Sequence, residues 1–151
     1  MNSRILRGLF VLLILPFPLF ASLGGDTTSV DSDQAKMQGT RQTTSNDFYT
    51  VHEIQASTGI AVKEFVSPAG KVFAVTWQGP AHPDLRQLLG SYFDQYTQAV
   101  QQQRALRRGH GPLLIQLPGL VVQSAGHPRS FLGRAYVPQM LPANVRAEDL
   151  R

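Results

Sequence analysis

The chain has 151 residues, a formal net charge of +4 at pH 7 and no cysteine. This length allows one domain and scarcely a second, and the lack of cysteine excludes disulfides, thiol catalysis and a lipid-modified cysteine. Without Arg4 and Arg7, which lie in an expected export signal, 12 of the 14 basic residues remain against 10 acidic residues. The resulting charge of about +2 does not support nucleic-acid binding.

Residues 1–21 have the pattern of a secretory signal peptide. Arg4 and Arg7 give a positive start, residues 9–15 form an apolar run, and two prolines interrupt the chain before Ala21. The run is shorter than the ~20 residues that span a bilayer, so we expect no transmembrane span after cleavage and a periplasmic or secreted protein. An uncleaved N-terminal anchor is the alternative, and the bulky residue at the −3 position leaves the cleavage point open.

The stretch 22–46 is polar and rich in serine, threonine, aspartate and glutamine. Val30, Gln34 and Met37 have helical spacing, but they give only a thin apolar face. We therefore expect a polar N-terminal segment with at most one short helix, which either lies over the domain or stays mobile.

Three strands are predicted next, at 49–56, 60–66 and 71–77. The turns between them end in Gly59 and Gly70, as three-residue loops with a left-handed last position require. The third run is β-branched and aromatic and is apolar on both faces, which is typical of a central strand. We expect these strands to form an antiparallel meander.

A long amphipathic helix is predicted after the meander. Asp84 is a good N-cap, and Gln87 occupies the capping-box position three residues later. The apolar side chains recur at helical spacing and form one wide stripe, made of Leu85, Leu88, Leu89, Tyr92, Phe93, Tyr96 and Val100. Aromatic and aliphatic residues at this spacing usually belong to a core, so we expect the stripe to pack on the sheet.

The rest of the chain returns to strand-like patterns. Segments 113–116 and 120–123 predict one or two strands, and 131–137 predicts the last one. Prolines then end the sheet, so the domain covers 47–138 and a polar tail covers 139–151. The expected fold class is α+β, a mostly antiparallel sheet in the order β-β-β-α-β-β with one long helix packed on it.

No stretch carries a recognisable catalytic or metal-binding motif. The histidines, His52, His82, His110 and His127, have no i, i+4 spacing, and neither a nucleophile elbow nor a phosphate-binding loop is present. We therefore expect no cofactor and no metal, and we regard an enzyme as less favoured than a binding protein.

Polar groups in the predicted strands have two possible uses. Glu53 and Glu64 lie on neighbouring strands and could approach each other, although Lys63 or Lys71 would be simpler cross-strand partners. Arg134, in the last strand, either lies on the exposed face or pairs across the sheet with one of the two glutamates.

One basic cluster follows the long helix. Arg104, Arg107, Arg108 and His110 can interact with the negative end of the helix dipole. Alternatively, they can contact anionic lipid headgroups or envelope polymers.

Several motifs resemble those of a known family. They lie at 21–25, 49–53, 70–73, 77–80, 83–85, 89–90, 92–93 and 133–138. Together they resemble an uncharacterised proteobacterial family of exported proteins with a domain of unknown function. The resemblance covers nearly all of the chain after the signal and implies a small, exported, single-domain protein, but it supplies no catalytic residues.

Three hypotheses follow for function. The favoured one is an exported, non-enzymatic binding or interaction domain of the bacterial cell envelope, whose partner is an envelope protein or polymer. The second is an enzyme with a dispersed polar site near His52, Glu64 and Arg134, which requires these side chains to converge in one pocket. The third is a surface-associated structural protein that uses the basic residues Arg104, Arg107 and Arg108.

Overall fold

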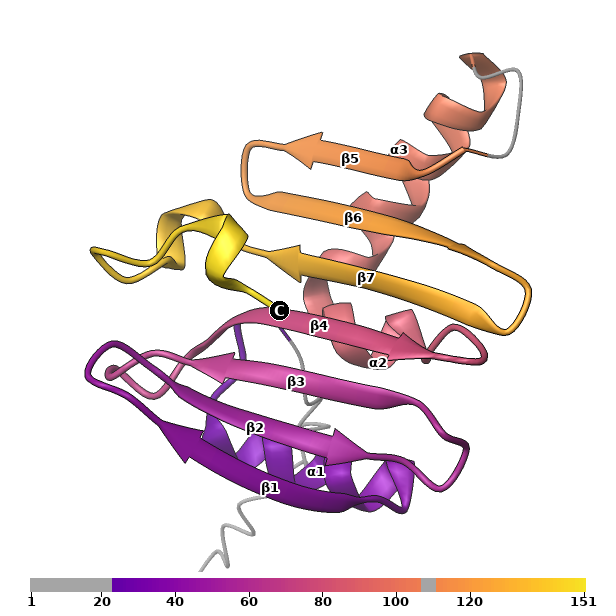
Figure 1. The fold of residues 1–151 in the computed structure, drawn as a ribbon. Coiled ribbons are helices and arrows are strands. Elements are labelled where there is room, and N and C mark those ends of the chain that lie inside the picture. The colour runs from indigo at the N-terminus through magenta and orange to yellow at the C-terminus, as the bar shows by residue number, and fades with distance from the viewer. Residues whose placement is uncertain (1–22, 107–110) are drawn as a thin grey trace, which may run out of the picture.

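The computed structural model describes residues 23–106 and 111–151. A seven-stranded antiparallel sheet forms its centre, with the helices on one face and the C-terminal segment on the other (Figure 1). The predicted signal peptide, and Arg107, Arg108 and His110 of the basic cluster, lie outside the described residues.

The sheet is built from two meanders that meet at its centre. Its strands are β1 (Thr40–Ser45), β2 (Thr50–Gln55), β3 (Ala61–Val66), β4 (Val72–Gly79), β5 (Leu113–Leu117), β6 (Leu120–His127) and β7 (Ser130–Tyr136). Their spatial order is β1-β2-β3-β4-β7-β6-β5. The central position of β4 agrees with its apolar residues on both faces.

The predicted class is confirmed, but the predicted order of elements is wrong. A mostly antiparallel sheet with one long helix is present. The predicted order, β-β-β-α-β-β, lacks one helix and one strand near the N-terminus, and it has two strands after the long helix where the structure has three. Strand β1 was missed because its residues are polar and mostly exposed, so it lacks the alternating apolar pattern that indicates a half-buried strand. It lies at an edge of the sheet, where a polar strand is well tolerated.

The helical layer comes from two parts of the chain. Helix α1 (Thr27–Met37) lies behind β1 and β2, and helices α2 (Leu85–Leu89) and α3 (Phe93–Leu106) cover the other half of the same face (Figure 1). The single long helix of the prediction is interrupted by a 3₁₀ turn, η1 (Gly90–Tyr92). Gly90 has φ 50° and ψ −120°, a conformation that glycine adopts without the steric penalty of a side chain.

The striped face packs on the sheet as predicted. Leu88 and Leu89 are fully buried, and Phe93 packs against the same core from a partly buried position. Every residue of the predicted stripe belongs to this core or contacts it. The sheet side contributes mainly aliphatic residues from its central strands, including Val62, Val75 and Val122.

The N-cap of α2 is formed as predicted. One carboxylate oxygen of Asp84 accepts hydrogen bonds from the backbone N–H groups of Arg86, at 2.9 Å, and Gln87, at 3.2 Å. We expect Asp84→Ala to lower the free energy of unfolding by about 1 kcal/mol, measured by urea denaturation. A change below about 0.3 kcal/mol would show that packing alone fixes the start of this helix.

The C-terminal residues cover part of the opposite face. Two 3₁₀ turns, η2 (Pro138–Met140) and η3 (Ala147–Asp149), bring Val145 and Leu150 onto a second, smaller cluster. This cluster contains Phe65, Phe73 and Ala74 from β3 and β4. The segment predicted as a polar tail therefore contributes two buried side chains.

A glycine allows close packing where the two meanders meet. Gly133 of β7 lies opposite Trp77 of β4. A Cβ atom at position 133 would overlap the buried indole ring and would lie 2.8 Å from the carbonyl oxygen of Gln123. The lack of a side chain at Gly133 is therefore what lets the ring of Trp77 lie across β7.

Candidate binding site

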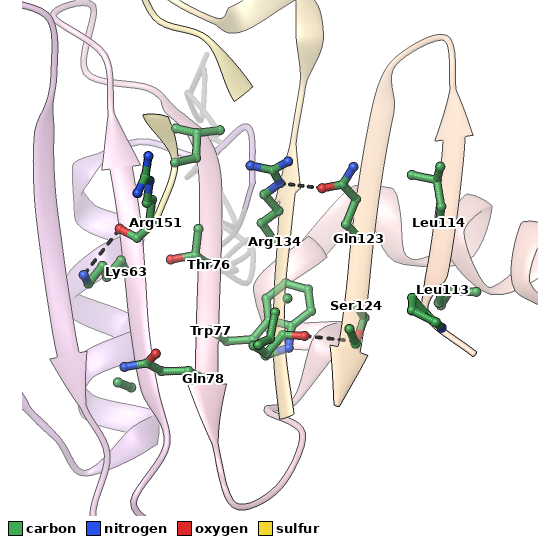
Figure 2. A pocket seen from close by; sticks show the side chains of 16 residues that line it. Lys63, Thr76, Trp77, Gln78, Leu113, Leu114, Gln123, Ser124, Arg134 and Arg151 are labelled. Carbon is green, nitrogen blue, oxygen red and sulfur yellow. Dashed lines mark hydrogen bonds between the residues drawn. The ribbon is translucent and has the colours of Figure 1, made fainter. Parts of the chain in front are cut away.

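The part of the sheet that the C-terminal segment leaves uncovered forms a hollow of about 570 Å³. It extends across β3, β4, β7, β6 and β5, and Leu150 and Arg151 form one wall. Figure 2 shows Lys63 and Arg151 towards one end, Leu113 and Leu114 towards the other, and Arg134 between them. We call this site the open-face hollow.

A row of polar side chains crosses the floor of the open-face hollow. The strand register places Lys63, Thr76, Arg134 and Gln123 next to one another on β3, β4, β7 and β6. The Nε–H of Arg134 donates to the side-chain oxygen of Gln123 at 2.6 Å (Figure 2), and its Nη1 donates to the carbonyl oxygen of Ala147. These bonds hold the guanidinium group in a fixed position on the sheet.

Arg134 forms no ion pair within the described part of the chain. Of the two alternatives for Arg134, the pairing with Glu53 or Glu64 is therefore not formed, and the residue lies on the face of the sheet that carries the open-face hollow. Instead, Glu53 lies 3.8 Å from the ammonium group of Lys63, which confirms the simpler cross-strand partner. Lys63 also donates to the carbonyl oxygen of Arg151 at 3.3 Å. Lys63 and Arg134 are the two partly buried cations of the polar row, and of these two Arg134 lacks an acidic partner within the described residues.

Two exposed leucines border this polar row. Leu114 on β5 is 41% exposed and Leu132 on β7 is 57% exposed, and both line the open-face hollow. Phe48, which is 43% exposed, lies in the β1–β2 turn and does not line it. Apolar side chains beside a fixed cation make this surface suited to a ligand that is itself part apolar and part anionic.

Arg134 was predicted from the sequence as a candidate binding residue, but neither Leu114 nor Leu132 was. Single exposed leucines are common on protein surfaces, so only their position in the sheet makes them notable. Alternation along the last strand places Leu132 and Arg134 on one face. The alternation shows that Leu132 and Arg134 lie on the same face of the sheet, but it does not show whether the helices cover that face.

Glu64 has a structural position that the sequence did not indicate. Its side chain is 1% exposed and faces α1, where Asp33 is fully buried. Burial, together with the neighbouring Asp33, raises the pKa of Glu64 to about 9, and burial also raises the pKa of Asp33. Glu64 is thus protonated at neutral pH and donates its proton to Asp33, which also accepts a hydrogen bond from Gln87 of α2.

This buried carboxyl pair connects three elements. Asp33 comes from α1, Glu64 from β3 and Gln87 from α2, so the pair ties both helices to the sheet. The approach of Glu53 to Glu64, which the sequence left open beside the simpler lysine partners, does not occur, because adjacent register positions place the two side chains on opposite faces of the sheet.

His52 lies on the helix-covered face, beside Glu64. The two residues are opposite each other on β2 and β3, and His52 Nδ1 lies 3.0 Å from the hydroxyl oxygen of Thr43. Burial lowers the pKa of His52, so its neutral form predominates at pH 7. Arg134 lies on the opposite face, so His52, Glu64 and Arg134 do not converge in one pocket as the enzyme hypothesis required.

Arg104 is the member of the predicted basic cluster that the structure describes. It is exposed in the last turn of α3, where a cation interacts favourably with the helix dipole. It borders a second hollow, of about 480 Å³, on the helix-covered side of the sheet, together with His82 and Phe131. The rings of His82 and Phe131 lie 4.2 Å apart.

Residues 23–106 and 111–151 contain neither a metal-binding cluster nor a membrane-spanning helix. Within these ranges, no three His, Asp or Glu side chains are grouped closely enough to hold a metal ion. No helix in them has the length and hydropathy to span a membrane.

Fold and site together define a small α+β domain in which helices bury one face of a single antiparallel sheet and a hollow opens on the other. The chain belongs to the family described as proteins of unknown function (DUF2844), whose model matches residues 19–150. The predicted membership of an uncharacterised family is thereby confirmed. Neither the curated proteins nor the solved structures gave a match.

Proposed function

We propose that the protein is an exported, non-enzymatic domain of the bacterial cell envelope, and that it binds an envelope component in the open-face hollow. The observation that carries the proposal is the combination of a fixed cation, Arg134, with exposed Leu114 and Leu132 in one concave surface. The signal-like pattern of residues 1–21 supports export.

The composition of the hollow favours binding over catalysis. None of the described residues that line it is a histidine, aspartate or glutamate. General acid–base catalysis requires a group that exchanges protons near the working pH, and arginine and lysine stay charged there. Fixed hydrogen-bond donors and apolar side chains are the groups expected in a recognition surface.

We expect Leu132→Ser to weaken retention of the purified protein by native envelope fractions at least about fivefold. The substitution removes apolar area that a bound partner would cover, and covering part of a leucine is worth about 1 kcal/mol. The measurement is co-sedimentation of the protein with envelopes over a range of envelope concentrations.

Phe48→Ser is the matched control, because Phe48 is a similarly exposed apolar residue outside the hollow. It should be retained like the wild type. Equal retention of the Leu132 variant and the wild type would refute binding through this face. Turnover of a hydrolase substrate that a single polar substitution abolishes would refute the non-enzymatic assignment.

A further inference from the structure

We infer that the open-face hollow binds a single-chain amphiphile with a carboxylate head, whose apolar chain lies on Leu114 and Leu132 and whose head meets Arg134. This inference rests on the proposed function and names the chemistry of its ligand. Three properties of the hollow, namely charge, size and position in the sheet, support it.

The charge argument concerns Arg134. Its hydrogen bonds in the described chain involve Nε and Nη1, which leaves Nη2 to face a ligand. The cost of removing a partly buried cation from water is poorly compensated when it has no carboxylate partner, and a bound anion would supply that partner. Lys63 is a weaker candidate because Glu53 and the carbonyl oxygen of Arg151 already occupy it.

The size of the hollow favours one acyl chain. A volume of about 570 Å³ accommodates ~19 heavy atoms at ~30 Å³ each, the volume of a water molecule in the liquid. This is enough for a medium or long fatty acid, whereas both chains of a phospholipid could not be accommodated within the hollow. Such a ligand would also cover Leu114 and Leu132 along its length.

The position of the hollow argues against a peptide strand. It lies on the face of the sheet, where four of the five strands that it crosses, β3, β4, β7 and β6, have ladder partners on both sides, and the free edge belongs to β5 at one end of the hollow. Peptides that bind by extending a sheet need an unpaired strand edge, and the face of these strands offers side chains only. An acyl chain needs no backbone hydrogen bonds, so this surface suits it better.

The test uses dodecanoate as the probe and follows its binding by isothermal titration calorimetry, because the ring of Trp77, the single tryptophan of the chain, is buried in the helix-side core. We expect saturable binding, and we expect Arg134→Met to weaken it at least about tenfold, as loss of one charge-assisted hydrogen bond would. Arg134→Lys should restore part of the affinity. Leu132→Ser should also weaken binding, and Phe48→Ser should leave it unchanged.

Dodecyltrimethylammonium is the matched ligand control, because it has the same chain and the opposite charge. It should bind at least about tenfold more weakly than dodecanoate, and Arg134→Met should not weaken its binding further. Equal binding of the two amphiphiles, or equal dodecanoate affinity of wild type and Arg134→Met, would overturn the inference. Near-ultraviolet circular dichroism of each variant checks that Trp77 keeps its packed environment.

The outcomes separate this inference from the proposed function. If envelopes retain the protein through Leu132 but dodecanoate does not bind, the ligand class is wrong and the proposed function stands. The same conclusion holds if an acidic peptide binds through Arg134 in place of dodecanoate. If dodecanoate binds through Arg134 but envelopes do not retain the protein, the ligand inference stands and the proposed function fails.

Discussion

Replacing Glu64 with glutamine should stabilise the protein by roughly 3 kcal/mol at pH 7. Burial holds the pKa of Glu64 at about 9 in the folded state, whereas an unfolded chain releases this proton near pH 4.5. The folded state therefore binds the additional proton between these two values, and its stability falls by about 1.4 kcal/mol per pH unit as the pH rises through this window. Glutamine is nearly isosteric, can donate to Asp33 and does not titrate.

The pH dependence gives the sharper test. Below about pH 4.5 Glu64 is protonated in both the folded and the unfolded state, so Glu64→Gln should have little effect on stability there. The gain in the free energy of unfolding should then increase with pH up to about pH 9. Urea unfolding at several pH values measures both quantities. Glu53→Gln is the control, since Glu53 is partly exposed on the other face and pairs loosely with Lys63, and it should change stability by less than about 0.5 kcal/mol. A destabilised Glu64 variant at pH 8 would contradict the shared-proton interpretation.

Gly133→Ala should destabilise the protein by about 3 kcal/mol. The added methyl group would overlap the indole ring of Trp77 and would lie too close to the carbonyl oxygen of Gln123. Neither group can move freely, because Trp77 is buried and the carbonyl belongs to the backbone of β6. Overpacking of this kind costs about 1–3 kcal/mol and more when the backbone must shift.

Gly119→Ala is the matched control, because a methyl group in that turn would have no neighbour within 4 Å. It should leave the free energy of unfolding within about 0.5 kcal/mol of the wild type. Trp77→Phe should partly relieve the defect by providing space, so the double variant should lose at least about 1 kcal/mol less than the sum of the single variants. Strict additivity would mean that the ring is not the obstacle.

The striped helix and the central strand could be predicted from the sequence because each has a strong internal pattern. Leu88 and Leu89 are buried where the 3.6-residue period placed them, and β4 is central because both of its faces are apolar. The interruption of the helix at Gly90 could not be predicted from the sequence, since a glycine within a helical pattern is often tolerated. Strand β1 lacks an apolar period altogether.

The candidate site was harder to predict because it depends on contacts between distant segments. Arg134 stood out as a charge in an apolar strand, but its partners Gln123 and Ala147 come from other elements. Similarly, Glu64 looked like a surface glutamate in a cross-strand pair, and only the docking of α1 buries it against Asp33. Local sequence patterns determine neither the order of the strands in the sheet nor the face of the sheet on which a helix packs.

The contact between β4 and β7 has a consequence for how the protein folds. Each meander can form from neighbouring hairpins, but the ladder that joins them pairs Val75 with Ala135, 60 residues further along the chain. Closing so long a loop is slow relative to forming hairpins, so this ladder should form late and be among the last steps of folding. The open-face hollow lies across the same ladder, and a bound molecule would therefore slow the separation of the two halves during unfolding.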